Sequence, residues 1–152
     1  MYKSLFYFIA LLVFSLASAS TTQAQDVKTL LCKTWKYDMP QLKEIMAAKF
    51  AELPEDKRKE QESTMAMFMP MLEVLRMEFK ADGTLNTMAM GQTQVGVWAI
   101  EADGKTIKTV GKDPSGQEKT TLLTIVKISP ESLMLASPEK PSDPAQPFIP
   151  AD

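Results

Sequence analysis

Four methionines occupy alternate positions of one short segment and have the clearest potential for chemistry in this sequence: Met65, Met67, Met69 and Met71. Thioether sulfur is a soft ligand that suits Cu(I). Alternate residues of a helix point to different faces, so the four sulfurs converge only where the helix unwinds, which Pro70 favours. Methionine also fills apolar gaps and lines adaptable surfaces. We therefore expect an apolar lid and no metal here, with a Cu(I) site as the alternative.

No other group of residues predicts catalysis. The sequence has no histidine and one cysteine, which excludes the commonest general base and any intramolecular disulfide. It contains neither a Gly-x-Ser-x-Gly motif nor a phosphate-binding glycine loop. The net charge is −2, and the basic run 57–59 is flanked by acidic residues, which argues against a nucleic-acid partner. We expect a protein that is not an enzyme and has no cofactor.

The first 24 residues have the layout of a secretory signal peptide. A positively charged start precedes an apolar run from Leu5 to Leu16, which small and polar residues follow. Ala19 and Ala24 both fit a cleavage site, and we expect cleavage after Ala24. The run is shorter than the roughly 20 residues of a membrane span, so we expect no span after signal removal, with an uncleaved anchor as the alternative. The predicted location is periplasmic or secreted, where the lone Cys32 is either buried packing or a reactive thiol.

Residues 40–74 predict a pair of helices. Apolar residues of the first helix recur at spacings of three and four, at Leu42, Ile45, Met46, Phe50 and Leu53. Pro40 suits the first turn of this helix, and Pro54 both interrupts it and suits the start of the next. A second apolar stripe follows at Met65, Phe68, Met69, Leu72 and Leu75. Pro70 lies inside this stripe and is expected to kink or end the helix near Met69.

The rest of the chain predicts β-structure. Alternating apolar residues indicate strands at 75–79, 85–90, 94–100, around 107–110, at 120–128 and at 132–137, with one more at 35–38. Asp82-Gly83 and Asp103-Gly104 predict hairpin turns, and residues 113–116 match a type I turn. Seven or eight short strands in one meander close most simply as a barrel.

The last segment, residues 138–152, has no periodicity. It contains five of the ten prolines, which cannot donate to a strand ladder. We therefore expect a Pro-rich disordered or extended tail. Phe148-Ile149 is its only apolar pair and the one part of it that could dock.

Several short motifs resemble those of the small bacterial lipocalin-like domain family. They are the segment from Leu30 to Lys36, F-x-x-D-G-T at 79–84, G-x-W-x-I followed by D-G-K-x-I at 96–107, and the apolar pair at 125–135. The resemblance covers roughly 30–37 and 75–136. It implies a mainly β fold, an up-and-down antiparallel barrel of about seven or eight strands spanning 25–137, with a helical insert at 40–74. Members of this family are exported and mostly of unassigned function.

The leading functional hypothesis is an exported, non-enzymatic barrel that binds a small apolar ligand in the barrel or under the helical lid. The expected ligand-binding residues are Met65, Phe68, Met69, Leu72, Met77, Phe79 and Trp98. The tryptophans, Trp35 and Trp98, are either core anchors or cavity lining. A second hypothesis is an interaction module that uses the insert and tail to hold another envelope protein, and Cu(I) binding is the third. A barrel packed solid, with an exposed apolar helix face, would favour the second.

Overall fold

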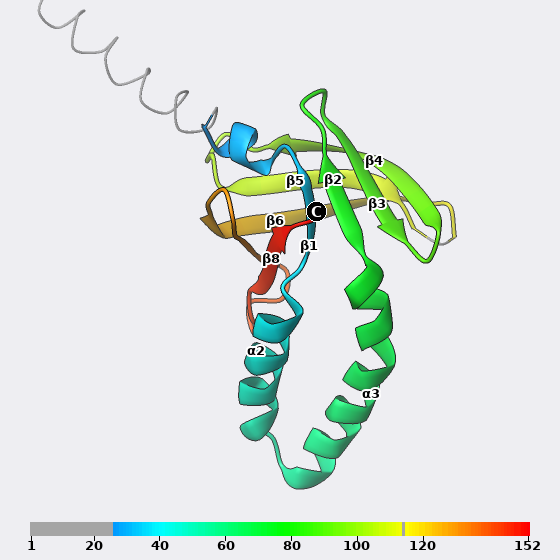
Figure 1. The fold of residues 1–152 in the computed structure, drawn as a ribbon, viewed down its shortest axis with the longest axis vertical. Helices are drawn as coiled ribbons and strands as arrows, with labels where there is room; N and C mark the ends of the chain where they lie inside the picture. Colours follow the sequence, from blue (N-terminus) through cyan, green and yellow to red (C-terminus); the bar gives the residue numbers. More distant parts are fainter. Residues whose placement is uncertain (1–25, 114) are drawn as a thin grey trace, which may run out of the picture.

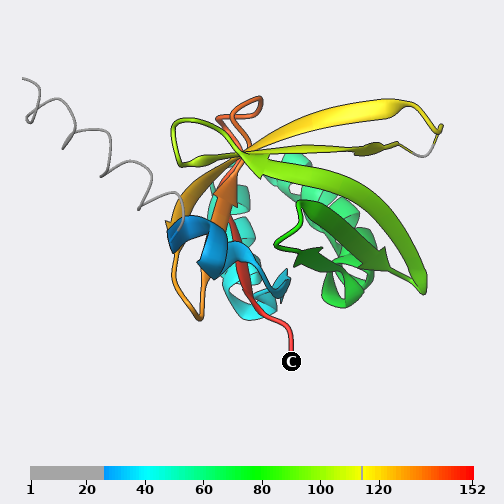
Figure 2. The ribbon, with the colours of Figure 1, turned by 90° about the horizontal axis from the view of Figure 1, so that it is seen from above.

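The computed structural model describes residues 26–113 and 115–152, so the predicted signal peptide and its cleavage site lie outside the described residues. Within them, eight strands form a closed antiparallel barrel whose strand order follows the sequence. Two helices follow the first strand and project together from one side of the barrel (Figure 1). Seen from above, the strands lie over these helices (Figure 2). The mainly β barrel with a helical insert after the first strand is therefore confirmed.

The elements are short and joined by tight connections. Their bounds are β1 (Thr34–Tyr37), α2 (Met39–Ala51), α3 (Glu55–Val74), β2 (Arg76–Phe79), β3 (Thr84–Ala89), β4 (Gln92–Ile100), β5 (Thr106–Lys112), β6 (Glu118–Ile128), β7 (Leu133–Ala136) and β8 (Gln146–Pro150). Residues 26–31 are helical and precede β1. Among the described residues, no helix has both the length and the apolar character to cross a membrane.

The predicted Asp-Gly hairpins are confirmed, and each aspartate organises its turn. Asp82 Oδ1 accepts the Thr84 N–H at 2.9 Å, while Gly83 adopts the left-handed φ of 89°. Asp103 Oδ1 likewise accepts the N–H groups of Lys105 and of Thr106, the first residue of β5. The β3–β4 turn has no Asp-Gly pair that would predict it. Its residue Met90 has a φ of 51°, at a position that usually favours glycine or asparagine.

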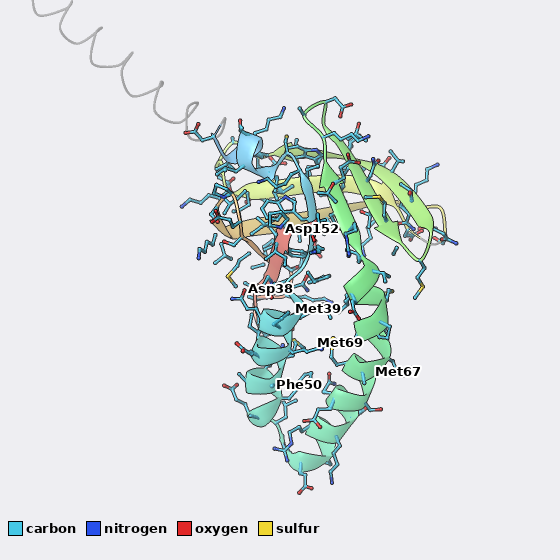
Figure 3. The ribbon with its side chains drawn as sticks, viewed as in Figure 1. Asp38, Met39, Phe50, Met67, Met69 and Asp152 are labelled. Carbon is cyan, nitrogen blue, oxygen red and sulfur yellow. The ribbon has the colours of Figure 1, made fainter. Side chains whose placement is uncertain are left out.

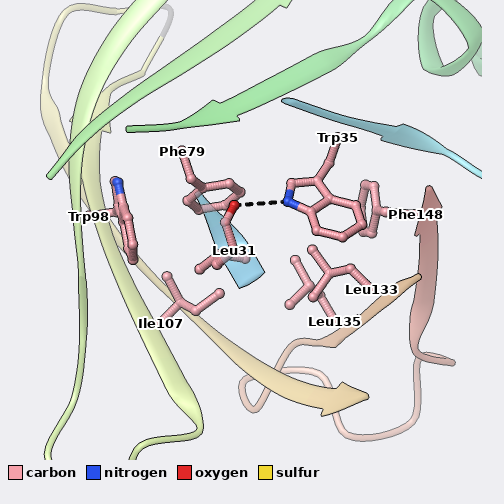
Figure 4. Close-up of a cluster of buried hydrophobic side chains, with 8 residues drawn as sticks. All are labelled: Leu31, Trp35, Phe79, Trp98, Ile107, Leu133, Leu135 and Phe148. Atoms are coloured by element: carbon pink, nitrogen blue, oxygen red, sulfur yellow. Dashed lines mark hydrogen bonds between the residues drawn. The ribbon is translucent and has the colours of Figure 1, made fainter. Parts of the chain in front are cut away.

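The barrel interior is filled by one apolar cluster (Figure 4). Strand register places these side chains inward together; they are Leu31, Trp35, Phe79, Trp98, Ile107, Leu133, Leu135 and Phe148. Both indole N–H groups are satisfied: Trp35 Nε1 donates to the Leu31 carbonyl and Trp98 Nε1 to the Lys80 carbonyl, each at 3.0 Å. Leu31 comes from the helical segment before β1 and is fully buried. The tryptophans are therefore core anchors.

Both helices begin where the prolines predicted. Asp38 caps α2 by accepting the Gln41 N–H at 3.1 Å, with Pro40 in the first turn. Pro54 precedes α3, whose first turn carries acidic residues that complement the helix dipole.

The expected end of the second helix near Met69 is wrong, because α3 continues through Pro70 to Val74. Pro70 removes one intrahelical hydrogen bond, to the carbonyl of Ala66, and Ala66 is exposed, so water can satisfy that carbonyl. The last turn is also held from outside the helix, since Arg76 Nη1 donates to the Glu73 carbonyl at 2.8 Å.

The prediction of a disordered tail is wrong for residues 146–150, which form β8. This strand pairs with β1 on one side and β7 on the other and so closes the barrel. The prolines are tolerated because other backbone groups of this segment make the hydrogen bonds to β1. The Pro147 carbonyl accepts the Asp38 N–H at 3.0 Å, and the Ala151 N–H donates to the Thr34 carbonyl at 2.9 Å. Phe148 is 3% exposed and packs in the barrel core, so the apolar part of the tail docks against the barrel.

Cys32 lies at the edge of the apolar cluster and is half-buried. Burial raises the pKa of its thiol, an effect that the nearby Lys28 ammonium partly opposes. The thiol therefore stays protonated at neutral pH, which favours packing over a nucleophilic role.

Trp98→Ala should lower the free energy of unfolding by about 3–5 kcal/mol, because it removes a buried indole from the cluster. Val97→Ala is the matched control: Val97 is 57% exposed on the outer face of the same strand, and we expect a change within about 0.5 kcal/mol. Urea denaturation measures both. Equal midpoints for the two variants would show that the register of β4 is wrong.

Phe148→Ala should also cost about 3–5 kcal/mol, because β8 closes the barrel and Phe148 packs within it. Glu139→Ala, in the exposed connection between β7 and β8, should leave stability unchanged. A Phe148→Ala protein with the thermal midpoint of wild type would contradict closure of the barrel by β8.

Candidate ligand-binding site

The barrel itself offers little room for an apolar ligand. Its apolar cluster fills the part nearest residues 26–31 (Figure 4). The remaining hollow, between β3 and β6, measures about 150 Å³ and has a largely polar inward lining that includes Thr87, Gln94, Thr109, Lys119 and Thr121. Ligand pockets usually measure about 300–1,000 Å³ and are mainly apolar. Among the described residues, the space of that kind lies elsewhere.

A groove of about 660 Å³ runs between α2 and α3. Figure 1 shows the two helices diverging from the barrel, and Figure 3 shows side chains reaching into the space between them. One face of α2 lines the groove through Leu42, Met46, Lys49 and Phe50, and one face of α3 through Lys57, Glu60, Gln61, Met65 and Leu72, with Leu53 added by the connection between the helices. These spacings of three and four residues place each set on a single helix face.

The groove has an apolar floor, and the charged side chains of its two helices lie toward one end. Leu42 and Phe50 are buried although α2 lies outside the barrel, so the apolar stripe of this helix faces inward. Together with Met46, Met65 and Leu72 they give a continuous apolar surface. The charged side chains of the helices lie toward the connection between them, with Lys49 in the last turn of α2 and Lys57 and Glu60 in the first turns of α3, so the groove suits a molecule that is apolar along most of its length.

The third wall of the groove is the segment 143–146, beside Tyr37. Lys49 Nζ donates to Asp143 Oδ1 at 2.8 Å, which fastens this segment to α2. The Tyr37 hydroxyl donates to Gln146 Oε1 at 2.9 Å, which fastens it to β1. The Lys49 hydrogen bond lowers the pKa of Asp143, and burial raises the pKa of Tyr37, so at neutral pH the carboxylate is charged and the phenol neutral. The polar groups of this wall are therefore paired.

The structure separates the predicted site residues into two places. Met65 and Leu72 line the groove, and Met69 is half-buried on the inner side of α3 (Figure 3). Phe68 is 50% exposed and does not line the groove. Phe79 and Trp98 belong to the barrel core, and Met77 packs against it. The predicted lid residues and the predicted barrel residues thus do not share one pocket.

Several groove residues were missed from the sequence. Leu42, Met46 and Phe50 of α2, and Leu53 just after it, stood in a recognised apolar stripe, which could have suggested them. Tyr37, Asp143 and Gln146 had no such signal, because their place in the wall depends on β8, which was predicted to be disordered.

The methionine run does not converge. Helix α3 is continuous through the run, so successive members turn by about 200°. Met65 faces the groove, whereas Met67 is 79% exposed on the outer side (Figure 3). The unwinding that a Cu(I) site requires is absent from this segment. Within the described residues, His, Cys, Asp and Glu form no group of three or more suited to a metal ion.

Comparisons of the chain with protein-family models, curated proteins and solved structures give no match. We therefore infer a function from the geometry of the groove.

Lys49→Met should raise the pKa of Asp143 toward the ordinary aspartate range, because it removes the main group that lowers it. Carboxyl-carbon NMR titration measures this shift, with Lys43→Met, an exposed change on α2, as the control that leaves it in place. Because the folded-state pKa is lowered, the pair stabilises the fold above the unfolded pKa and loses this effect as pH falls through the folded one. We expect less than about 1 kcal/mol, since both partners are partly exposed. An unchanged titration in Lys49→Met would contradict the pair.

Proposed function

We propose that this chain is an exported, non-enzymatic, lipocalin-like protein that binds one small elongated apolar molecule between α2 and α3. The observation that carries the proposal is the groove of about 660 Å³ whose floor is apolar. Its volume and lining match those of small-molecule sites. The export layout of residues 1–24 supports a periplasmic or secreted location.

The size of the groove favours a small molecule over a partner helix. The α3 residues that line it run from Lys57 to Leu72, about 22 Å at the helical rise of 1.5 Å per residue. A helix of that length and about 10 Å diameter fills roughly 1,700 Å³. The groove offers less than half of that volume.

The chemistry of the lining supports binding without catalysis. Its ionisable side chains are Tyr37, Lys49, Lys57, Glu60 and Asp143. Lys49 and Asp143 pair with each other, and Tyr37 donates to an amide oxygen. No nucleophile with an adjacent general base lies among these lining residues, so the groove lacks the arrangement on which covalent or acid–base catalysis depends.

A second candidate function, docking of another envelope protein, has one observation in its favour. Apolar side chains are exposed on the outer side of α3 and at the β3–β4 turn: Met67, Val74 and Met90, the last 72% exposed. A shallow depression of about 540 Å³ lies between Pro70, Val74 and the turn residues 88–93. Contiguous exposed apolar surface of this kind is typical of protein contacts.

A matched pair of variants two residues apart separates the two functions. Met65→Glu places a carboxylate in the groove and should weaken binding of an environment-sensitive apolar dye by about tenfold or more, because the charge is desolvated by the ligand. Met67→Glu places the same charge on the outer side and should leave dye binding unchanged. Fluorescence titration measures the affinity, and near-ultraviolet circular dichroism of the barrel tryptophans reports folding.

Two results would contradict the groove proposal. One is the absence of saturable dye binding to wild type. The other is an equal loss in both variants while the circular dichroism stays native. Selective loss in Met67→Glu would instead support the outer surface as the binding face.

A further inference from the structure

The charges of the groove fall into two sets with different surroundings. Lys49, in the last turn of α2, and Asp143 neutralise each other at 2.8 Å. Nearer the connection between the helices, Lys57 and Glu60 lie one turn apart on the lining face of α3. Among the described residues, neither of these two side chains has an ion-pair or hydrogen-bond partner. Lys59 differs, because it pairs with Glu55 at 2.8 Å. The groove therefore presents one unpaired cation and one unpaired anion at a single end.

We propose that the ligand is a single-chain amphiphile with a zwitterionic head, a deepening that rests on the proposed function of the groove. The head lies against Lys57 and Glu60, and its anionic and cationic groups pair with the opposite charges. Side chains three residues apart on a helix have Cβ atoms about 5–6 Å apart. A phosphocholine or phosphoethanolamine head carries one anionic and one cationic group, so it can meet both side chains. Gln61 lies on the same face and offers an amide donor and acceptor beside them.

The apolar chain of the ligand runs from this end toward the barrel. Leu53, Phe50 and Met65 follow the charged residues, and Leu72 lies farther along α3. The far end is closed by Tyr37 and Gln146, whose polar groups are bonded to each other at 2.9 Å. An apolar chain beside polar groups that are already paired displaces no hydrogen bonds that those groups need, whereas a chain beside an unpaired charge would desolvate that charge at a cost in free energy. Only one end of the groove thus suits a charged head.

Heads with a net charge fit less well. An anionic head at Lys57 is repelled by Glu60, and a cationic head at Glu60 is repelled by Lys57, because both side chains line the same end. A zwitterionic head satisfies both. The groove is also too small for a second acyl chain beside the first at about 660 Å³, which favours single-chain molecules over bilayer lipids.

The test compares three head groups on one dodecyl chain, each below its micelle concentration, as competitors of the apolar dye on the purified protein. They are dodecylphosphocholine, dodecanoate and dodecyltrimethylammonium. We expect the phosphocholine to displace the dye at about tenfold lower concentration than either charged competitor. Lys57→Gln should shift the preference toward the cationic head, and Glu60→Gln toward the anionic one. Lys59→Gln, whose side chain pairs outside the groove, is the matched control and should keep the wild-type order.

The outcomes distinguish this inference from the function on which it rests. Equal displacement by all three heads, or an order that neither Lys57→Gln nor Glu60→Gln changes, would overturn the head-group assignment while the groove proposal stands. A wild-type protein that binds no dye would overturn the groove proposal itself. Binding to vesicles of a two-chain phosphatidylcholine, without displacement by the dodecyl phosphocholine, would show that a membrane surface is recognised and would also overturn the assignment.

Discussion

Closure of the barrel by β8 is the interaction on which the rest of the structure depends. This strand joins β7 to β1, so the sheet has no free edge among the described strands. The same pairing places Phe148 beside Tyr37, with ring centroids 4.4 Å apart, at the side of the barrel from which the helices project. It also carries the preceding segment, 143–146, against α2, where Asp143 meets Lys49. One strand therefore completes the core and builds a wall of the groove.

The barrel contains the packed core, and the two helices form the groove. The barrel interior is occupied by two tryptophans, two phenylalanines and four aliphatic side chains, so it forms a rigid base instead of a ligand cavity. The two helices connect β1 to β2. Because these strands pair with each other, the helix ends near the barrel are both fixed. Their apolar faces meet over only part of their length, and the space that remains is the groove. Ligand binding in such an arrangement leaves the core undisturbed.

Helix α3 shows why composition alone misleads about a surface. Its second half is apolar on more than one face, a pattern usual for a buried helix, yet none of its residues is buried. One face is explained by the groove through Met65 and Leu72. The outer face, with Met67 and Val74, remains exposed to solvent. Glutamate or lysine at these outer positions would have been favoured in a helix that only covers the groove.

Local sequence is sufficient to specify the features that depend on neighbours within a few residues. Asp82-Gly83 and Asp103-Gly104 specify their turns through aspartate oxygens and a left-handed glycine, and Pro40 and Pro54 mark the two helix starts. Alternation along β4 correctly placed Trp98 on one face and Val97 on the other.

Features that depend on partners distant in the sequence are set by tertiary contacts. Residues 146–150 become a strand because β1 and β7 flank them, and the pairing of Tyr37 with Phe148 joins opposite ends of the described chain. Trp98 is core instead of pocket lining because Leu31 and its neighbours fill the barrel. Met65 faces a groove because α2 and the segment 143–146 lie opposite it. Periodicity specifies which side chains share a face, but the surface that the face meets is set by chain closure, which no local pattern encodes.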